Sequence, residues 1–210
     1  MRLKLTGIAA LAASIALVLA ACSSQTEPAR DVATTPTTSP PACVVGEPGP
    51  GGGTIFYHDA AGGECFEAAP SGWYGGEDQN LAWGTGGGAA GTCSNQDIPG
   101  ATGMAIGTGK ANTTAITSNT ACDTPKKAPA AWAAKNYAGG GLNDWFLPSE
   151  DELNQLYAQK TTVGGFTVVD RYWSSSQFVA RFARFQVFVN GDQNFDSKFF
   201  TYRVRPVRAF

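Results

Sequence analysis

Five cysteines and one histidine are the residues of this 210-residue chain with the most evident chemistry, which is metal binding or disulfide formation. The cysteines are Cys22, Cys43, Cys65, Cys93 and Cys122. No two of them form a Cys-x-x-Cys pair and His58 is the only histidine, so we expect no metal site. Thiols of exported proteins normally pair, and an odd number leaves one for another role. If that one is Cys22, the other four can form two disulfides in three ways. We favour Cys43 with Cys65 and Cys93 with Cys122, because each pair closes a local loop in a glycine-rich half with little helix or strand signal.

The N-terminal residues have the pattern of a secretory signal. Arg2 and Lys4 precede an apolar run through Leu19 that is short for a transmembrane helix. The run ends in Leu19-Ala20-Ala21-Cys22, which resembles the lipobox of bacterial lipoproteins, whose cysteine becomes the lipidated first residue. This resemblance implies a signal peptide at 1–21 and a protein of the bacterial cell envelope, lipid-anchored and surface-exposed; the alternative is a plain signal peptide with a chance cysteine. After the lipidated Cys22, the Ser, Thr, Pro and Ala residues up to position 42 predict a disordered tether.

Three further groups could do chemistry, and each has a simpler interpretation. The acidic run 150–152 could bind calcium or supply an acid and a base, but the helix dipole favours acidic residues in a first turn and no matching ligand set is visible. The sequence Gly107-Thr108-Gly109-Lys110 resembles a phosphate loop superficially, but Ala111 stands where Ser or Thr must hold the metal. The spacing of Asp144 and Glu152 does not mark a catalytic pair. We therefore expect no enzyme, no catalytic residue and no cofactor.

The elements that must position any site belong to one domain, residues 43–210, of mixed α and β structure. Thr54–Tyr57 and Cys65–Ala68 follow turn residues and predict a hairpin. A helix is expected at Pro129–Tyr137, followed by Gly139-Gly140-Gly141. Ser149 and Glu152 form a capping box for a second helix, whose apolar face is Leu153, Leu156 and Tyr157.

The remaining segments are glycine-rich loops and alternating strands. We expect Gly84–Gly91 and Gly100–Gly109 to be irregular loops that a disulfide could hold. Residues 166–210 alternate apolar and polar side chains around Asn190-Gly191, which predicts antiparallel strands joined by a hairpin.

The C-terminal segment Arg171–Phe210 combines aromatic and charged residues in a way that one core cannot absorb. Between Ser176 and Arg203 it contains Phe178, Phe182, Phe185, Phe188, Phe195, Phe199 and Phe200, interleaved with Arg181, Arg184, Asp192, Asp196 and Lys198. Exposed aromatics with arginine are typical of binding surfaces. The net charge of the chain is −2, which argues against nucleic acid as the partner.

Several ordered motifs resemble the Lcl C-terminal domain family, named for a collagen-like adhesin. They are Gly49-Pro50-Gly51-Gly52-Gly53-Thr54-Ile55-Phe56-Tyr57, Glu67-Ala68-Ala69-Pro70, Trp83-Gly84, Ile106 to Thr113, Asp144-Trp145-Phe146-Leu147-Pro148-Ser149, Tyr172-Trp173-Ser174-Ser175-Ser176 and Val204-Arg205-Pro206-Val207-Arg208. The resemblance spans Val45 to Phe210. It implies a C-type-lectin-like α+β fold with a small twisted antiparallel sheet, two helices and long glycine-rich loops stabilised by disulfides. The calcium-ligand motifs Glu-Pro-Asn and Trp-Asn-Asp are absent, so we expect no calcium requirement.

The tail also resembles the variable region of target proteins that retroelements diversify. In such regions a reverse transcriptase miscopies adenines, so AAC codons scatter into many residue types within a fixed frame. The fixed frame here comprises Trp173 to Gln177, Gln186, Phe188, Asn190-Gly191, Gln193, Lys198 and Arg203 to Arg208. The resemblance implies that residues 171–210 form the variable region. Its implied ligand-binding positions, all of types that an AAC codon can reach, are Phe178, Val179, Arg181, Phe182, Arg184, Phe185, Val187, Val189, Asp192, Asn194, Phe195, Asp196, Ser197, Phe199, Phe200, Thr201 and Tyr202.

Three functions follow from these patterns, and the first is favoured. It is a surface-displayed lipoprotein that binds a protein or glycan ligand on another cell or phage through a diversified C-terminal face, held to the membrane by its N-terminal lipid and binding no nucleic acid. The second is a fixed adhesin for anionic polysaccharide, driven by Arg171, Arg181, Arg184 and Arg203; its binding should weaken at high salt, unlike aromatic-driven binding. The third is an enzyme resembling the sulfatase-activating oxidases, with Cys93 and Cys122 as a reactive pair. No His or perturbing cluster adjoins these cysteines, which favours a structural disulfide.

Overall fold

The C-terminal segment forms most of a five-stranded sheet in the computed structural model, which describes residues 43–167 and 170–210. The signal peptide, Cys22 and the tether lie outside these residues. The strands are β3 (Asn80–Ala82), β4 (Arg171–Val179), β5 (Phe182–Val187), β6 (Gln193–Ser197) and β7 (Thr201–Arg203), in the order β3-β7-β4-β5-β6. The predicted hairpin is confirmed: β5 and β6 pair antiparallel, and Gly191 in their connection has a φ of 87°, which glycine adopts without strain.

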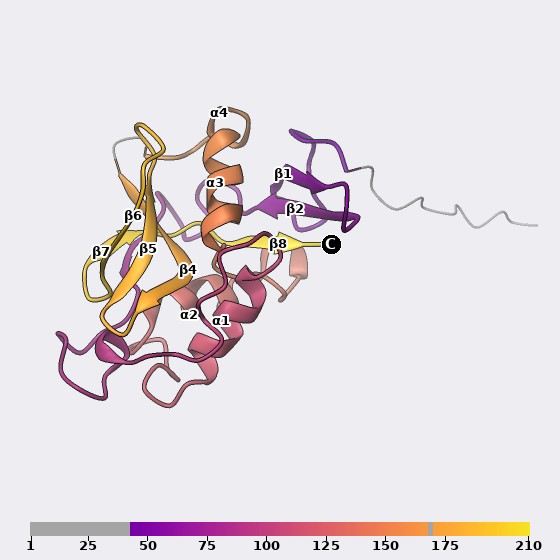
Figure 1. Ribbon diagram of the computed structural model, residues 1–210. Helices are drawn as coiled ribbons and strands as arrows, with labels where there is room; N and C mark the ends of the chain where they lie inside the picture. Colours follow the sequence, from indigo (N-terminus) through magenta and orange to yellow (C-terminus); the bar gives the residue numbers. More distant parts are fainter. Residues whose placement is uncertain (1–42, 168–169) are drawn as a thin grey trace, which may run out of the picture. The chain divides into compact units, whose positions relative to one another are not determined.

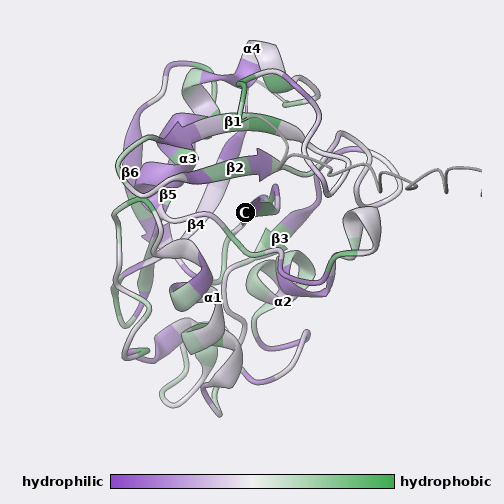
Figure 2. Cartoon of the chain, turned by 90° about the vertical axis from the view of Figure 1, so that its right-hand side faces the viewer, coloured by the Kyte–Doolittle hydropathy of each residue, from purple (hydrophilic) through white to green (hydrophobic). Residues whose placement is uncertain are grey.

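A second, three-stranded sheet joins the start of the domain to its end. It consists of β1 (Thr54–Asp59), β2 (Glu64–Ala68) and β8 (Val207–Ala209), in the order β1-β2-β8. The predicted β1–β2 hairpin is thus confirmed. The C-terminus lies beside these strands in Figures 1 and 2. The sequence did not anticipate two features: the division into two sheets, and the parallel bridge between Tyr172 of β4 and Arg203 of β7.

The described residues 43–167 and 170–210 contain four α-helices, whereas two were expected. They are α1 (Gly109–Ser118), α2 (Pro129–Asn136), α3 (Glu150–Ala158) and α4 (Lys160–Val163). Helices α2 and α3 match the predictions, and α3 has both hydrogen bonds of the capping box between Ser149 and Glu152. Helix α1 begins at the last residue of a segment expected to be a loop and has no side-chain cap, so its start carries no local signal.

The core consists of two apolar clusters on opposite sides of β4. Tyr172 faces the cluster formed with α3, β1 and β2, whereas Trp173 faces the cluster formed with α1 and α2. Successive strand residues point to opposite faces, so β4 is buried on both sides. Figure 1 shows α3 between the two sheets, with α1 and α2 below the larger one. The described residues therefore form an α+β fold of the C-type-lectin-like type.

Two disulfides hold the loop-rich half, in the pairing that the sequence favoured. Cys43 is joined to Cys65 and Cys93 to Cys122, with Cα–Cα distances of 5.6 and 4.9 Å. The second disulfide fastens the segment after β3 to the end of α1, and both of its cysteines are buried.

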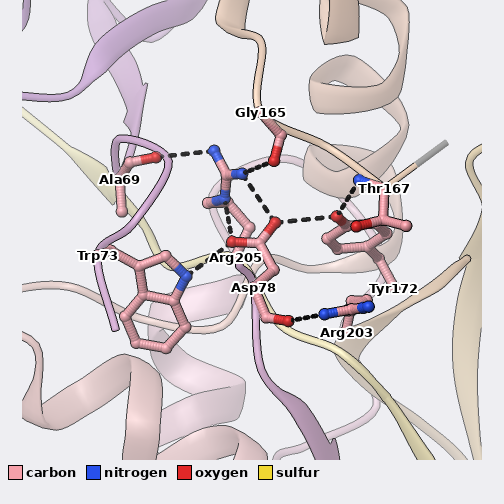
Figure 3. Close-up of polar contacts among 8 residues, drawn as sticks. All are labelled: Ala69, Trp73, Asp78, Gly165, Thr167, Tyr172, Arg203 and Arg205. Carbon is pink, nitrogen blue, oxygen red and sulfur yellow. Dashed lines mark hydrogen bonds and ion pairs between the residues drawn. The ribbon is translucent and has the colours of Figure 1, made fainter. Parts of the chain in front are cut away.

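Buried ion pairs fix the strand ends that carry the C-terminal segment. Arg205 donates two hydrogen bonds of 2.7 Å to the carboxylate of Asp78, which also accepts from Trp73 and Tyr172 (Figure 3). Arg203 donates to the main-chain oxygen of Asp78 from the other side. Both carboxylate oxygens and the main-chain oxygen of Asp78 accept hydrogen bonds. Since Tyr172 belongs to β4 and Arg203 to β7, this network holds the two strands in one arrangement.

The glycine-rich segment before β1 wraps a second buried carboxylate. Glu67 accepts hydrogen bonds from Gly51 N and Gly53 N at 2.8 and 3.2 Å, and from Arg208 Nη1 at 2.7 Å. A Cβ atom on Gly51 would lie 2.5 Å from the ring of Trp145, so this close approach requires glycine. No helix within residues 43–167 and 170–210 is both long and apolar enough to cross a membrane.

Candidate ligand-binding surface

Most of the residues that the sequence assigned to a fixed frame are buried. Positions 173–177, 186, 188, 198 and 204–208 are all buried, whereas Arg203 and Gly191 are half-buried and Asn190 and Gln193 are exposed. The exposed Gln193 is nevertheless tied down, because its Nε2 donates to Glu150 O at 3.1 Å.

Two frame side chains, Gln177 and Lys198, bond to each other beneath the β6–β7 turn. Lys198 Nζ donates to Gln177 Oε1 at 2.6 Å and to Gln96 O at 2.9 Å, and lies 4.5 Å from the ring centroid of Trp83. Burial lowers the pKa of Lys198 to about 7, an effect that nearby Asp97 opposes. A lysine here is therefore part of the interior, although its neighbours in the sequence reach solvent.

A third frame residue, Gln186, connects β5 to helix α3. Its Nε2 donates to Asn154 Oδ1 at 2.8 Å and to Gly191 O at 3.1 Å. This amide therefore holds the β5–β6 connection against the helix, which fixes the position of the hairpin. Phe188 follows it and packs against Tyr172 with a ring-centroid distance of 4.2 Å.

Of the seventeen positions predicted to contact ligand, sixteen are exposed or half-buried. The exception is Phe185, which is 6 % exposed and packs against Trp173 and Tyr202. The prediction that Phe185 contacts the ligand is therefore corrected. The strand register places Phe185 opposite Trp173, over the core, and the residue types that a codon can reach do not reveal which face of a strand a residue occupies.

The sixteen accessible positions do not share one face, contrary to the expectation of a single face. In the β5–β6 pairing, Arg184 lies opposite Phe195 and Phe182 opposite Ser197, which puts these four on one side. Residues 194 and 196 alternate with them and point to the other side, where Val187 also lies.

The first group contains an aromatic patch, which we define as Phe178, Phe182 and Phe195. The rings of Phe178 and Phe195 are stacked with centroids 4.2 Å apart, and the ring of Phe182 lies 5.8 Å from that of Phe195. The guanidinium of Arg184 lies 5.0 Å from the Phe178 centroid and forms an ion pair of 3.2 Å with Glu150 at the start of α3. Phe178 and Phe195 are 39 % and 42 % exposed, so the patch presents two stacked rings to solvent. The positive charge of Arg184 is fixed beside them by its contacts with Phe178 and Glu150.

On the side of the sheet where Val187 lies, there is a polar hollow of about 380 Å³. It is lined by Asn80, Asp170, Arg171, Val187, Thr201 and Tyr202. Three of these are predicted contact positions, at 187, 201 and 202. Arg171 was predicted to bind ligand only in the alternative of an adhesin for anionic polysaccharide. Asn80 was not predicted; it comes from β3, far away in the sequence, and carries no signal that could have identified it.

Most of the other predicted contacts lie in the turns at the two ends of β6. Phe199 and Phe200 follow β6, are both exposed and pack against each other at 4.8 Å. Val189 and Asp192 lie in the β5–β6 connection, also exposed. Arg181, in the turn before β5, donates from Nε to Asn95 Oδ1 at 3.2 Å.

The groups considered for catalysis have structural partners. Glu152 accepts hydrogen bonds from Gly107 N at 2.8 Å and Gly109 N at 3.2 Å, so the glycines that resemble a phosphate loop hold an internal carboxylate. Burial raises the pKa of Glu152 to about 7, opposed by the hydrogen bonds from Ser149, Gly109 and Gly107. Among the described residues, no three His, Cys, Asp or Glu side chains lie close enough together to hold a metal ion.

Comparison with known proteins adds no assignment to this geometry. No protein-family model matches the chain, and a search of curated proteins finds no match. The function is therefore argued from the accessible side chains of 178–202 and the buried residues that hold them.

Proposed function

We propose that this chain is a surface-displayed bacterial lipoprotein, related to the Lcl C-terminal domain family, that binds a protein or glycan ligand through the accessible residues of 178–202. In this proposal Cys22 carries the lipid, the segment up to residue 42 is the tether, and the protein is not an enzyme. We further propose that a retroelement diversifies the accessible positions.

The separation of accessible from buried residues along one segment is the observation that supports this function. Frame side chains such as Gln177, Gln186 and Lys198 are buried and hydrogen-bonded, while sixteen of the seventeen positions between them reach solvent. The backbone is thus held by buried side chains and does not depend on the exposed ones. Binding loops on rigid folds have the same arrangement.

The burial of the second disulfide favours a binding function over the oxidase alternative. Cys93 and Cys122 are 1 % and 0 % exposed, inside the core cluster that contains Trp83 and Trp173. A catalytic cysteine pair must meet its substrate, and these sulfur atoms have no such access.

The charge distribution weakens the alternative of a fixed adhesin for anionic polysaccharide. Arg184 is paired with Glu150, and Arg203 is paired with Asp170 at 2.7 Å. Two of the four arginines on which that function depends are thus engaged within the protein, whereas the aromatic patch is accessible.

A test of diversification is to sequence the DNA around the gene. We expect a reverse transcriptase gene and a near-copy of the segment encoding residues 172–210 that differs almost only where the copy carries adenine. A neighbourhood with neither would refute diversification but leave the binding surface to be tested separately.

The binding surface is tested with a double substitution in the aromatic patch, Phe178→Ser with Phe195→Ser. The fluorescently labelled mature chain is applied to panels of bacterial cells and phage particles, and those that bind the wild type are compared with the variant. Loss of two aromatic anchors should weaken binding by about thirtyfold or more, since one hot-spot residue in an interface accounts for about 2 kcal/mol. Because both side chains are partly solvent-exposed, the melting temperature should change little.

The matched control is Tyr74→Ser, which removes an aromatic ring that is 51 % exposed but lies outside residues 171–210. It should bind as the wild type does. If the patch variant bound normally and the control lost binding, the ligand surface would lie elsewhere on the domain.

A further inference from the structure

Arg171, the first residue of β4, differs from its neighbouring arginines in what it touches. Arg184 and Arg203 form ion pairs with Glu150 and Asp170, and Arg181 donates to the Asn95 side chain. Within residues 43–167 and 170–210, Arg171 forms no ion pair, and it lines the polar hollow defined above. This cation therefore remains available to a ligand.

Two aromatic rings hold the guanidinium of Arg171 in place. Its central carbon lies 5.3 Å from the ring centroids of both Phe185 and Tyr202, within the range of cation–π attraction. This contact gives the buried Phe185 a role: it supports the arginine from below. A side chain that is already ordered loses little further conformational entropy when it binds.

The hydroxyl of Tyr202 gives the cluster a fixed direction of hydrogen bonding. Tyr202 donates its proton to Asp196 Oδ2 at 2.5 Å and accepts from Arg171 Nη1 at 3.0 Å. Burial raises the pKa of Tyr202 to about 12, and the hydrogen bond to Asp196 adds to the rise, so the hydroxyl keeps its proton at physiological pH. Asp196 is thereby satisfied by the phenol instead of by the arginine.

The guanidinium has donors left for a planar acceptor. Arginine has five N–H donors, and within the part of the chain that the structure describes one donor of Arg171 is used, by Tyr202. The hollow around it, about 380 Å³ in volume, is also lined by Thr201 and Asn80, whose side chains carry a hydroxyl and an amide. Two parallel N–H groups match the two oxygens of a carboxylate, a geometry that strengthens and orients the contact.

We propose that Arg171, with Thr201 and Asn80 beside it, forms a subsite for a single carboxylate group of the ligand. A monoanion fits better than a dianion such as phosphate, because two carboxylates would repel the second negative charge. Asp170 lines the same hollow, and Asp196 is hydrogen-bonded to the hydroxyl of Tyr202. The subsite rests on the proposed function, since it lies among the predicted contact positions 187, 201 and 202. It adds a fixed cationic anchor to an otherwise aromatic surface.

The test is a side-chain NMR titration of the ¹⁵N-labelled mature chain, with Cys22→Ser in place of the lipidated residue. Sodium acetate is the probe, and sodium chloride at equal ionic strength is the reference. We expect saturable shifts of the Arg171 Nε–H signal and the Tyr202 ring signals with acetate and not with chloride. Arg171→Gln should abolish the Tyr202 shift, and Lys126→Gln, which removes an exposed positive charge outside residues 171–210, should leave it unchanged.

Arg171→Lys keeps the charge but lacks the two-pronged geometry, and should reduce the acetate-induced shift at Tyr202 markedly. It also serves if Arg171→Gln fails to fold. Equal shifts with acetate and chloride, or tighter binding of inorganic phosphate than of acetate, would overturn the carboxylate subsite. N-acetylglutamate amide and glucuronate then distinguish a protein side chain from a sugar acid as the source of the carboxylate.

The two proposals fail in different ways. Carboxylate shifts at Arg171 without any binding to cells or phage would retain the subsite and refute the proposed function. Cell binding that depends on Phe178 and Phe195, with no acetate effect at Arg171, would retain the ligand surface and refute the subsite.

Discussion

The buried Lys198 should make the stability of the domain rise with pH above neutrality. Burial lowers its pKa in the folded protein to about 7, from an ordinary value of 10.5. Between these values the unfolded chain binds more protons than the folded protein, so the free energy of unfolding increases with pH. Below pH 7 both states carry the charged lysine, and this dependence is absent.

The size of the effect follows from the shift. Each pKa unit corresponds to about 1.4 kcal/mol, and the part of the shift sampled between pH 7 and pH 9 amounts to roughly 2 kcal/mol. For a domain of this size that is about 4 to 8 °C in melting temperature. The two hydrogen bonds from Lys198, to Gln96 and Gln177, need only the two N–H donors of a neutral amine, so they persist when the proton leaves.

The assay is thermal unfolding at several pH values between 6 and 9, comparing the wild type with Lys198→Met. The variant should lose the rise in melting temperature, whatever its absolute stability. Lys126→Met, at an exposed position, should keep it. A wild-type slope in the Lys198 variant would show that this lysine is not the titrating group and that its burial has been misjudged.

Two further predictions concern the loops that support the sheet. Gly109→Ala should destabilise the domain by about 1 to 3 kcal/mol through overpacking, because its Cβ would lie 2.7 Å from Ser149 N and closer still to Glu152. The control is Gly76→Ala, whose Cβ would have no atom within 4 Å and which should leave the melting temperature unchanged. Replacing Cys93 and Cys122 by serine should cost about 3 to 4 kcal/mol, since the disulfide closes a loop of 29 residues. Denaturant unfolding measures both, and an unchanged midpoint in either variant would contradict the role assigned to the contact.

The elements that the sequence predicted correctly are those with local signals. The capping box of α3 needs only Ser149 and Glu152, three residues apart, and the β5–β6 hairpin needs only Asn190-Gly191 between alternating strands. Helix α1 lacks such signals. It is held by tertiary contacts, such as the hydrogen bonds of Asn112 Nδ2 to Gly103 O and to Ser175 Oγ, which no local pattern reveals.

The exposure of the candidate positions was predictable from residue type, but their division into two faces was not. Residue type separated most accessible positions from buried ones, because Gln177, Gln186 and Lys198 of the fixed frame form hydrogen bonds inside the protein. The register of β5 against β4 and β6 decides the face of each residue, and it depends on bulges near Gln177 and Val179. For the same reason the hollow, which brings Asn80 beside Arg171, could not be read from spacing.

The buried polar side chains suggest why exposed positions of this surface can change without loss of the fold. Lys198 bonds to Gln96 O, 102 residues earlier, and Gln186 bonds to Asn154, 32 residues earlier. These contacts fix the strands through residues that are not exposed, so substitutions at exposed Phe199 or Val189 should cost little stability. The freedom is uneven, however. Tyr202 donates a hydrogen bond to Asp196 and accepts one from Arg171, so substitution of Tyr202 should disturb both partners, and variation at these positions should be coupled.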